Sequence, residues 1–213
     1  MTDIGTWNEY TRFLITLIAV LDPFMAVPVF LTITATRSPD ATRHLARSVA
    51  ITVFLVLLVS AIGGEKLLEL MGGSIASFRV GGGLVLLLMA LAMLHAQTGH
   101  MRQTAEEEAE VAAGETSGVV PLAIPLLAGP GAISTVIIAV QHGGWIHRAI
   151  IVALIFVVCV LAWLAMRLAT PIGRYLGTTG INIANRLLGL LLTAIAIETM
   201  AIGLKLLFPG LGG

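Results

Sequence analysis

Charged residues are scarce in this 213-residue chain, and their scarcity argues against an ordinary water-soluble globular protein. Only 11% of the residues are Asp, Glu, Lys or Arg, whereas 57% are hydrophobic, and the mean hydropathy is +0.98. A soluble domain carries about 25% charged residues, so this chain cannot cover its apolar surface with polar side chains. The composition therefore indicates an integral membrane protein.

Cysteine is limited to Cys159, which excludes an internal disulfide framework and a cysteine-based metal site. The sequence holds no HExxH motif, and it suggests neither a buried serine beside a histidine nor a twin acidic cluster of the kind that catalysis would need. We therefore expect no metal, no cofactor, no enzyme activity and no nucleic-acid partner. The five histidines are expected at helix ends or in loops: His44, His95, His100, His142 and His147.

Long apolar runs predict an all-α integral membrane fold with six transmembrane helices. A spanning helix needs roughly 20 apolar residues to cross about 30 Å of hydrocarbon, and the runs do not alternate as the strands of a membrane barrel would. The predicted spans are 8–34, 46–71, 75–95, 118–140, 147–170 and 182–207. We predict a first three-helix repeat over 1–96, a polar cytoplasmic linker over 97–117 and a second three-helix repeat over 118–213.

Basic residues predict the orientation of these spans. The first, third and fifth connections carry seven arginines, against five basic residues on the opposite side, and such an excess favours the cytoplasm. We therefore expect a multi-pass protein of the bacterial cytoplasmic (inner) membrane with both termini outside. The seven are Arg37, Arg43, Arg47, Arg102, Arg167, Arg174 and Arg186; the five are Arg12, Lys66, Arg79, Arg148 and Lys205.

The two halves of the chain form an internal repeat with a shift of 130 − 23 = 107 residues, which relates Pro23 to Pro130. The same shift carries Arg79 onto Arg186 and Gly82 onto Gly189. Because each half has an odd number of spans, the second half must enter the membrane from the opposite side. Inverted repeats with Pro/Gly interruptions in corresponding segments are typical of secondary transporters, which place their substrate between broken helices.

The first interruption is Asp22-Pro23-Phe24-Met25-Ala26-Val27-Pro28, in the middle of span one. Asp22 suits an N-cap and Pro23 the first helical position, and Pro28 removes a further helical hydrogen bond, so we expect bent or unwound backbone from Leu21 to Pro28. Asp22 is interpreted either as a structural cap alone or as a cap that also binds substrate or a cation, because a carboxylate at this depth is costly.

The second interruption, Gly129-Pro130-Gly131, predicts a break in span four without an acidic cap. Its glycines allow either close backbone approach or positive φ, and the bare helix N-terminus attracts anions. Ser134 and Thr135 are expected either to offer hydroxyl donors or to bond back to their own helix. A small zwitterion would suit both breaks, with its ammonium toward Asp22 and its carboxylate toward the amides after Pro130.

Two segments, Asp22 to Phe30 and Ala123 to Ser134, resemble the signature motifs of the MarC family of membrane proteins, and the resemblance covers nearly the whole chain. It implies an inner-membrane protein with a three-plus-three inverted repeat, and for some members transport of small neutral amino acids such as glycine and alanine. The chain departs from the family pattern at Met25, where glycine is common, and this larger side chain bears on the substrate size.

Three further charged residues are expected inside the membrane. Arg79 and Arg186 are candidate charge partners for Asp22 or for a substrate carboxylate; the alternative is that they snorkel to the interface. Glu198 is, with Asp22, a candidate for coupling to H+ or Na+, or else it bonds internally or pairs with Lys205. Asn182 and Asn185 are expected to cap and pack the start of span six, and Gly81 to Gly83 with Gly189 are expected to allow close helix packing.

The function predicted from these features is a secondary transporter of small neutral amino acids that works by alternating access. Its predicted partners are the lipid bilayer, a small-molecule substrate and a coupling ion; the existence of a homo-oligomer is left open. The alternatives are an exporter of another small solute and a regulatory membrane protein that transports nothing. The predicted substrate-binding residues are Asp22, Pro23, Met25, Pro28, Gly129, Pro130, Gly131, Ser134 and Thr135.

Overall fold

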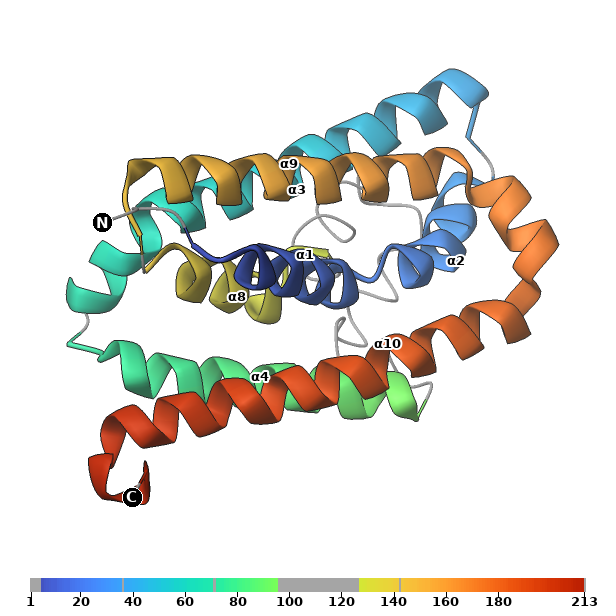
Figure 1. Ribbon diagram of the computed structural model, residues 1–213. Coiled ribbons are helices and arrows are strands. Elements are labelled where there is room, and N and C mark those ends of the chain that lie inside the picture. Colours follow the sequence, from blue (N-terminus) through green and yellow to red (C-terminus); the bar gives the residue numbers. More distant parts are fainter. Residues whose placement is uncertain (1–4, 36, 71, 96–126, 142, 213) are drawn as a thin grey trace.

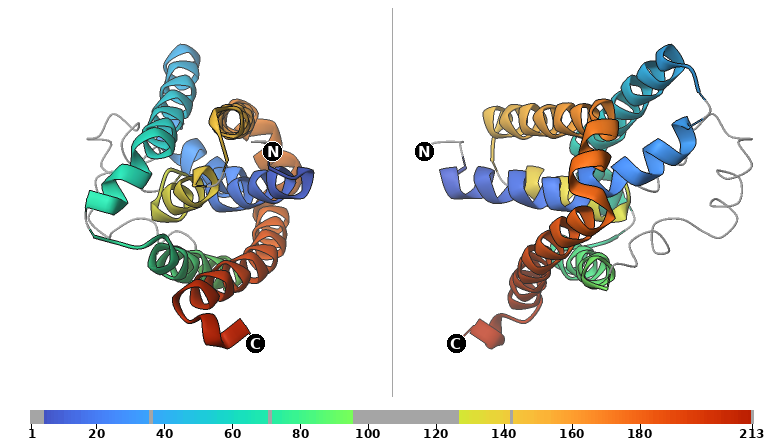
Figure 2. Two further views of the ribbon diagram at one scale, coloured as in Figure 1. Left: turned by 60° about the vertical axis from the view of Figure 1, so that its left-hand side comes forward. Right: turned by 90° about the vertical axis from the view of Figure 1, so that its right-hand side faces the viewer.

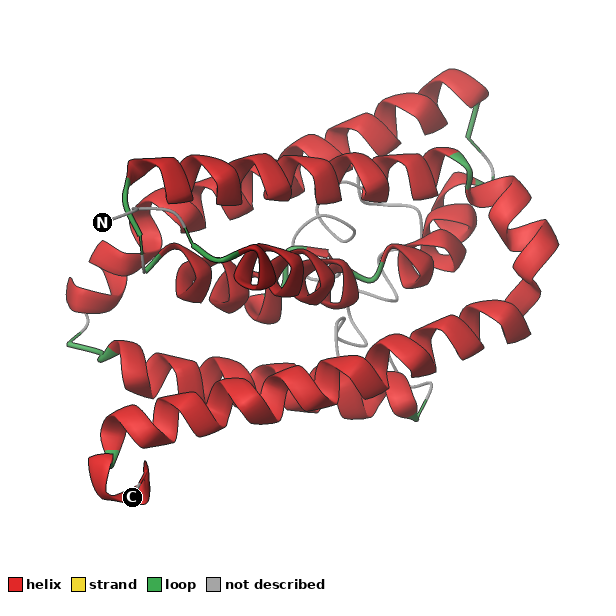
Figure 3. Ribbon diagram, viewed as in Figure 1, coloured by secondary structure: helices red, strands yellow, loops and turns green. Residues whose placement is uncertain are grey.

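The computed structural model describes residues 5–35, 37–70, 72–95, 127–141 and 143–212. Over these residues every regular element is helical, as Figure 3 shows, which confirms the all-α prediction. The helices are α1 (Trp7–Leu21), α2 (Pro23–Thr34), α3 (Pro39–Leu70), α4 (Ile75–Leu94), α8 (Pro130–Val140), α9 (Trp145–Arg167), α10 (Ala169–Leu207) and a terminal 3₁₀ helix, η2 (Pro209–Gly212).

Five stretches are long and apolar enough to cross a membrane, and they correspond to five of the six predicted spans. They are Trp7–Thr34, Pro39–Gly64, Ile75–Leu94, Trp145–Arg167 and Thr179–Leu207. The fourth predicted span contributes the short apolar helix α8, while its first part and the predicted linker 97–117 lie outside the described residues.

One predicted start is wrong. Span two is predicted from 46, but α3 begins at Pro39, where the backbone N–H of Ala41 donates to the Ser38 hydroxyl. Span six is predicted over 182–207, and the apolar stretch Thr179–Leu207 agrees with it. Helix α10 itself begins earlier, at Ala169, and kinks at Gly177, whose φ of 60° favours glycine. Asn182 and Asn185 therefore lie inside a helix rather than cap one.

The helices form three layers (Figures 1 and 2). Helices α3 and α9 pack together in one outer layer and α4 and α10 in the other, with α1, α2 and α8 between them. The first span is accordingly the most enclosed, with 56% of its most apolar stretch buried against 28–33% in the other four. The interruptions predicted from sequence thus lie in the middle layer.

Large apolar side chains cover the outside of the bundle, as expected for contact with lipid. Leu55 and Val59 of α3, Phe156 of α9 and Leu190 of α10 are all exposed. Trp7 and Trp145, the first residues of α1 and α9, are also exposed and lie at the same end of the bundle (Figure 1). Tryptophan is enriched where a membrane meets water, so this end has the character of an interface.

Candidate functional site

The first span breaks at a single residue, Asp22. This residue adopts a left-handed conformation (φ 46°, ψ 70°), so that α1 ends at Leu21 and α2 begins at Pro23. The Asp22 carboxylate accepts a hydrogen bond of 3.2 Å from the backbone N–H of Met25, and the residue is fully buried. These contacts confirm the predicted N-cap. The prediction of irregular backbone as far as Pro28 is wrong, because α2 continues through that proline.

The second break is the start of α8. Gly129 is the N-cap and Pro130 the first helical residue, and no side chain caps the helix among the described residues. Of the two alternatives for the glycines, positive φ is wrong, since Gly129 has φ −64° and Gly131 lies within the helix. Close approach applies to Gly131, where a methyl group would lie 2.5 Å from Sδ of Met89.

Ser134 and Thr135 bond back to their own helix, which was the second of the two alternatives predicted for them. Both hydroxyls donate to the carbonyl oxygen of Gly131, at 3.0 Å and 2.7 Å. Both side chains are buried. Their donor hydrogens are therefore occupied within α8, and only their oxygen lone pairs remain to accept a further hydrogen bond.

The structure brings the two breaks close together. A methyl group on Gly131 would lie 3.3 Å from Cγ1 of Val20, which is two residues before Asp22. The N-terminus of α8 therefore packs against the end of α1. Since peptide dipoles give a helix N-terminus a partial positive charge, a buried carboxylate and a positive helix end occupy neighbouring positions in the middle layer.

Asn185 is a residue of this region that the sequence interpretation missed. It is 2% exposed, and its Nδ2 lies 3.5 Å from Sδ of Met25. Its Oδ1 atom has no hydrogen-bond partner among the described residues, although an unsatisfied buried acceptor is costly. Met25 thus contacts Asp22 through its backbone and Asn185 through its sulfur. The sequence signal was the pair of asparagines Asn182 and Asn185 in an apolar helix, and their spacing does not indicate which of them faces α2.

A cavity of about 360 Å³ opens beside α1 and is lined from both halves of the chain. Leu86 and Thr135 connect it to the second break, because a methyl group on Gly131 would lie 3.3 Å from Leu86. Small-molecule sites are concave and combine apolar walls with polar groups, and this cavity has both kinds of lining residue. Its polar lining residues are Glu9, Tyr10, Arg12, Thr16, Arg79, Thr135, His147 and Thr199.

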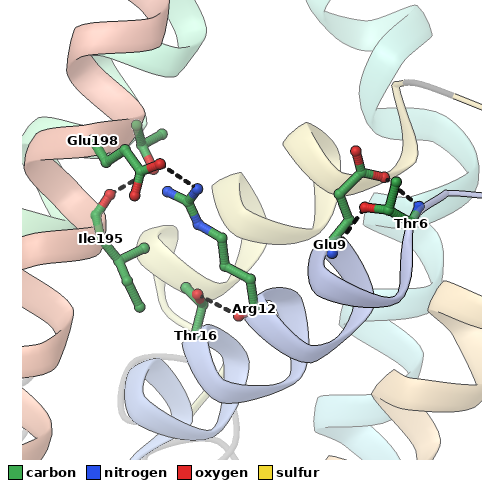
Figure 4. A network of polar contacts seen from close by, with 7 residues as sticks. Thr6, Glu9, Arg12, Thr16, Ile195 and Glu198 are labelled. Carbon is green, nitrogen blue, oxygen red and sulfur yellow. Dashed lines mark hydrogen bonds and ion pairs between the residues drawn. The ribbon is translucent and has the colours of Figure 1, made fainter.

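Glu198 pairs with Arg12, so pairing with Lys205, one of the alternatives predicted from the sequence, is wrong. Nη1 of Arg12 lies 2.6 Å from Oε1 of Glu198, so the pair links α1 to α10 (Figure 4). The side chains are 39% and 57% exposed. Arg12 had been counted only as a basic residue near the first span, and no local sequence pattern connects it with a residue of the last helix.

The two repeat-related arginines have different surroundings. Arg79 is half-buried and lines the cavity. Its Nε atom is buried and has no hydrogen-bond partner among the described residues. Arg186 is exposed on α10, as the snorkelling alternative requires. The salt bridges between described residues are Arg12–Glu198 and Arg43–Asp40. Neither Arg79 nor Arg186 takes part in them, so the predicted pairing of these two arginines with Asp22 is not seen among the described residues.

His147 is a second residue that the sequence interpretation underrated. It is 4% exposed at the start of α9, and its Nε2 lies 2.9 Å from the carbonyl oxygen of Ala139. Its Nδ1 lies 2.9 Å from the hydroxyl of Tyr10, which itself accepts from the N–H of Gly5. Because a carbonyl can only accept, Nε2 carries the hydrogen and Nδ1 accepts from Tyr10. The histidine thus joins α1, α8 and α9.

Two of the charged groups that line the cavity are engaged in contacts within the protein. Arg12 is engaged by Glu198, and Glu9 accepts from the N–H of Thr6 as part of a capping box (Figure 4). Among the described lining residues, Arg79 forms no salt bridge, and its planar fork fits a carboxylate. Within the described chain, no three His, Cys, Asp or Glu side chains are grouped as metal ligands.

Comparison with known proteins identifies the family of this chain. A family model described as "MarC family integral membrane protein" matches residues 7–208. The UPF0056 membrane protein YhcE of Escherichia coli is 37% identical over 205 residues, covering 95% of this chain and 94% of its own length. A UPF0056 membrane protein of Aquifex aeolicus is 32% identical, with 95% and 97% covered. No solved structure matches the chain at a significant level.

Proposed function

The chain belongs to the MarC family of integral membrane proteins, and we propose that it is a secondary transporter for small neutral amino acids of the glycine and alanine class. The observation that carries this proposal is the meeting of the two breaks in the middle layer. Asp22 is fully buried there, and the N-terminus of α8 packs against Val20. Broken helices whose ends meet between two halves are a recurrent feature of transporter substrate sites.

The proposed substrate site pairs acceptors with donors across these breaks. The ammonium group of the amino acid lies toward the Asp22 carboxylate and the unpaired Oδ1 of Asn185, which share Met25 as a neighbour. Its carboxylate lies toward the N-terminus of α8, around Pro130. The pairing is favourable because each charge of the zwitterion meets an opposite charge or partial charge in a region of low dielectric.

The cavity beside α1 is the proposed route to this site. Arg79 lines it and, within the described chain, forms no salt bridge, so it is available to attract the substrate carboxylate. Leu86 and Thr135 connect the cavity to the start of α8. In the predicted orientation the cavity opens to the outside, so the structure would correspond to an outward-facing state of an alternating-access cycle.

We propose six spans in two inverted three-helix repeats, with α8 forming part of the fourth. Helices α2, α3 and α4 then correspond to α8, α9 and the second part of α10, and the members of each pair run in opposite directions in Figure 1. Glycine contacts support the antiparallel packing of α4 and α10, since Gly83 meets Ala196 and Gly203 meets Ala76. Such a relationship lets the halves exchange conformations.

We also propose that the protein is not an enzyme, that it resides in the cytoplasmic membrane with both termini outside, and that H+ or Na+ couples through Asp22 or Glu198. The contacts of the candidate catalytic groups support the first point. Ser134 donates to Gly131, and His147 bonds to Tyr10 and Ala139, so neither contributes to a nucleophile and base pair.

The test is uptake and efflux of labelled alanine and glycine in proteoliposomes under imposed proton or sodium gradients. Wild-type protein should accumulate both amino acids and exchange them across the bilayer. Asp22→Asn should weaken apparent affinity by more than about tenfold, since it removes the charge facing the ammonium group. The matched control is Asp40→Asn, because the side chain of Asp40 is 92% exposed on α3.

A second pair of variants tests the contribution of Asn185. Asn185→Leu should weaken affinity for alanine, whereas Asn182→Leu on the exposed side of the same helix should not. Absence of gradient-driven transport by folded wild-type protein for both amino acids would contradict the proposed function. Equal effects of the two asparagine variants would contradict the proposed ammonium site alone.

A further inference from the structure

A second cavity, of about 500 Å³, lies where α2 and α9 end and α3 and α10 begin. Three of its lining residues are arginines: Arg37 from the α2–α3 connection, Arg43 from α3 and Arg167 from the last turn of α9. These residues belong to the first and fifth predicted connections. The cavity near Arg79 is lined by none of them, so the two cavities are separate features.

The charge of the second cavity is strongly unbalanced. Asp40, on the exposed first turn of α3, lies 3.2 Å from Nη1 of Arg43, an exposed contact between residues three positions apart. Such a contact contributes little energy and leaves the other donors of Arg43 available. The described residues that line the cavity thus include three arginines and neither Asp nor Glu. The repulsion among them is relieved when an anion with several acceptor oxygens binds.

One of the arginines is held in place by an aromatic ring. The guanidinium carbon of Arg167 lies 5.5 Å from the centre of the Trp163 ring, and both residues line the cavity. Stacking on a ring face leaves the N–H groups at the edge of the guanidinium plane free to donate. Arginine forks of this kind match the geometry of phosphate oxygens.

Part of the remaining wall is apolar. Phe30 and Met166 line the cavity but are almost fully buried, so its apolar surface comes mainly from Leu31 of α2 and Trp163 of α9, which are partly exposed. A small inorganic anion would leave this wall unused. A ligand with a phosphate group and a hydrocarbon chain would satisfy both the arginines and the apolar wall, and in a membrane such ligands are the anionic phospholipids.

We infer that the cavity lined by Arg37, Arg43 and Arg167 binds the phosphodiester headgroup of an anionic phospholipid, with one acyl chain along Leu31 and Trp163. The chemistry shared with free phosphate is the anionic phosphate group itself. The apolar wall and the position at the helix ends favour the lipid. This inference is independent of the proposed transport, because none of the residues belongs to the substrate site.

The test uses Trp163 as a reporter in full-length protein reconstituted in phosphatidylcholine vesicles. The chain has three tryptophans, and the other two, Trp7 and Trp145, are exposed, so replacing both with Phe leaves Trp163 alone. Phosphatidylglycerol with brominated acyl chains should quench Trp163 more strongly than brominated phosphatidylcholine at the same mole fraction. Arg37→Gln and Arg43→Gln should each weaken the apparent affinity for phosphatidylglycerol by about tenfold, the effect of losing one charge-assisted hydrogen bond.

Arg47→Gln is the matched control, because Arg47 is exposed on the same helix one turn beyond Arg43 and does not line the cavity. Its affinity for phosphatidylglycerol should stay within about twofold of wild type. Equal quenching by both brominated lipids, or equal losses in Arg47→Gln and Arg43→Gln, would overturn the inference. So would displacement of phosphatidylglycerol by inorganic phosphate at millimolar concentration, since the site would then select the free anion.

Discussion

Arg12 and Glu198 are 186 residues apart in the sequence and form an ion pair of 2.6 Å between α1 and α10. The pair joins the first helix of one proposed repeat to the last helix of the other. Both side chains are partly exposed, so the pair itself contributes about 0–1 kcal/mol to stability. Arg12 and Arg79 line the same cavity, so the prediction for this pair concerns the proposed transport and not stability.

The first prediction separates proton coupling from ion pairing at Glu198. Glu198→Gln should abolish accumulation driven by a pH gradient but leave exchange of alanine intact, because exchange does not require the return of an unloaded carrier. Arg12→Gln should retain pH-driven accumulation, since the carboxylate is still present. The measurement is labelled alanine uptake in proteoliposomes. Equal losses of pH-driven accumulation in the two variants would assign the effect to the ion pair. Full retention of accumulation in Glu198→Gln would exclude Glu198 from proton coupling.

The second prediction concerns neighbouring glycines in α4. A methyl group on Gly83 would lie 2.5 Å from Cγ of Met200 and 3.0 Å from the carbonyl oxygen of Ala196, whereas one on Gly81 would meet nothing within 4 Å. Gly83→Ala should destabilise the protein by about 1–3 kcal/mol through overpacking. Gly81→Ala should be neutral or stabilise it by about 0.4–1 kcal/mol, because it restricts the unfolded chain. Denaturation of the two variants in detergent checks this, and equal stabilities would contradict the packing of α4 on α10.

These two positions show where sequence reasoning succeeds and where it stops. Local patterns sufficed for the five apolar spans, the Asp22 cap and the Pro130 helix start, because they depend on composition and on residues a few positions apart. The glycines Gly81 to Gly83 were interpreted together as a packing motif, but only the structure distinguishes Gly81, which has no close neighbour, from Gly83.

The contacts that sequence reasoning missed are all long-range. Arg12 with Glu198, Tyr10 with His147 and Met25 with Asn185 are separated by 186, 137 and 160 residues. No helical period or motif relates such positions, since they meet only through the packing of whole helices. Asn185 illustrates the point: it was interpreted as part of a helix start, and the structure places it inside α10 against α2.

The third prediction tests the orientation in the membrane. A cysteine at Gln103 should react with a membrane-impermeant thiol reagent only from the cytoplasm, and one at Gly212 only from outside, because the odd-numbered connections hold the arginine excess. The native Cys159 is 4% exposed within α9 and should stay silent, so it serves as an internal control. The measurement is labelling of intact cells against inverted membrane vesicles. The opposite pattern would invert the proposed topology.

The fourth prediction concerns the side chain of Met25, whose sulfur contacts Nδ2 of Asn185 next to the first break. Met25→Gly should enlarge the proposed site and improve competition by leucine relative to alanine by about tenfold, since a methylene in an apolar pocket is worth about 1–3 kcal/mol. The same change should lower stability by about 1 kcal/mol, the helix penalty of glycine. Inhibition of labelled alanine uptake by leucine measures the first effect. Unchanged selectivity would place Met25 outside the site.

The last prediction separates the backbone role of Asp22 from the role of its charge. Its left-handed φ of 46° is tolerated by Asn and Gly but disfavours Ala. Its side chain caps α2, a function that Asn retains and that Gly and Ala lose. Stability should therefore decrease from wild type through Asp22→Asn and Asp22→Gly to Asp22→Ala, with about 2–3 kcal/mol lost in the last, the sum of αL strain and the missing cap.

Thermal unfolding in detergent measures this order, and alanine binding to the folded fraction measures the effect of the charge. Asp22→Asn should unfold close to the wild-type temperature and yet bind alanine more than about tenfold more weakly, because the charge that faces the ammonium group has been lost. If Asp22→Asn instead unfolds early while its folded fraction binds alanine with wild-type affinity, Asp22 is a structural cap and the ammonium group binds elsewhere. Asp22→Asn isolates the effect of the charge, because Asn tolerates the left-handed backbone conformation and can also cap α2.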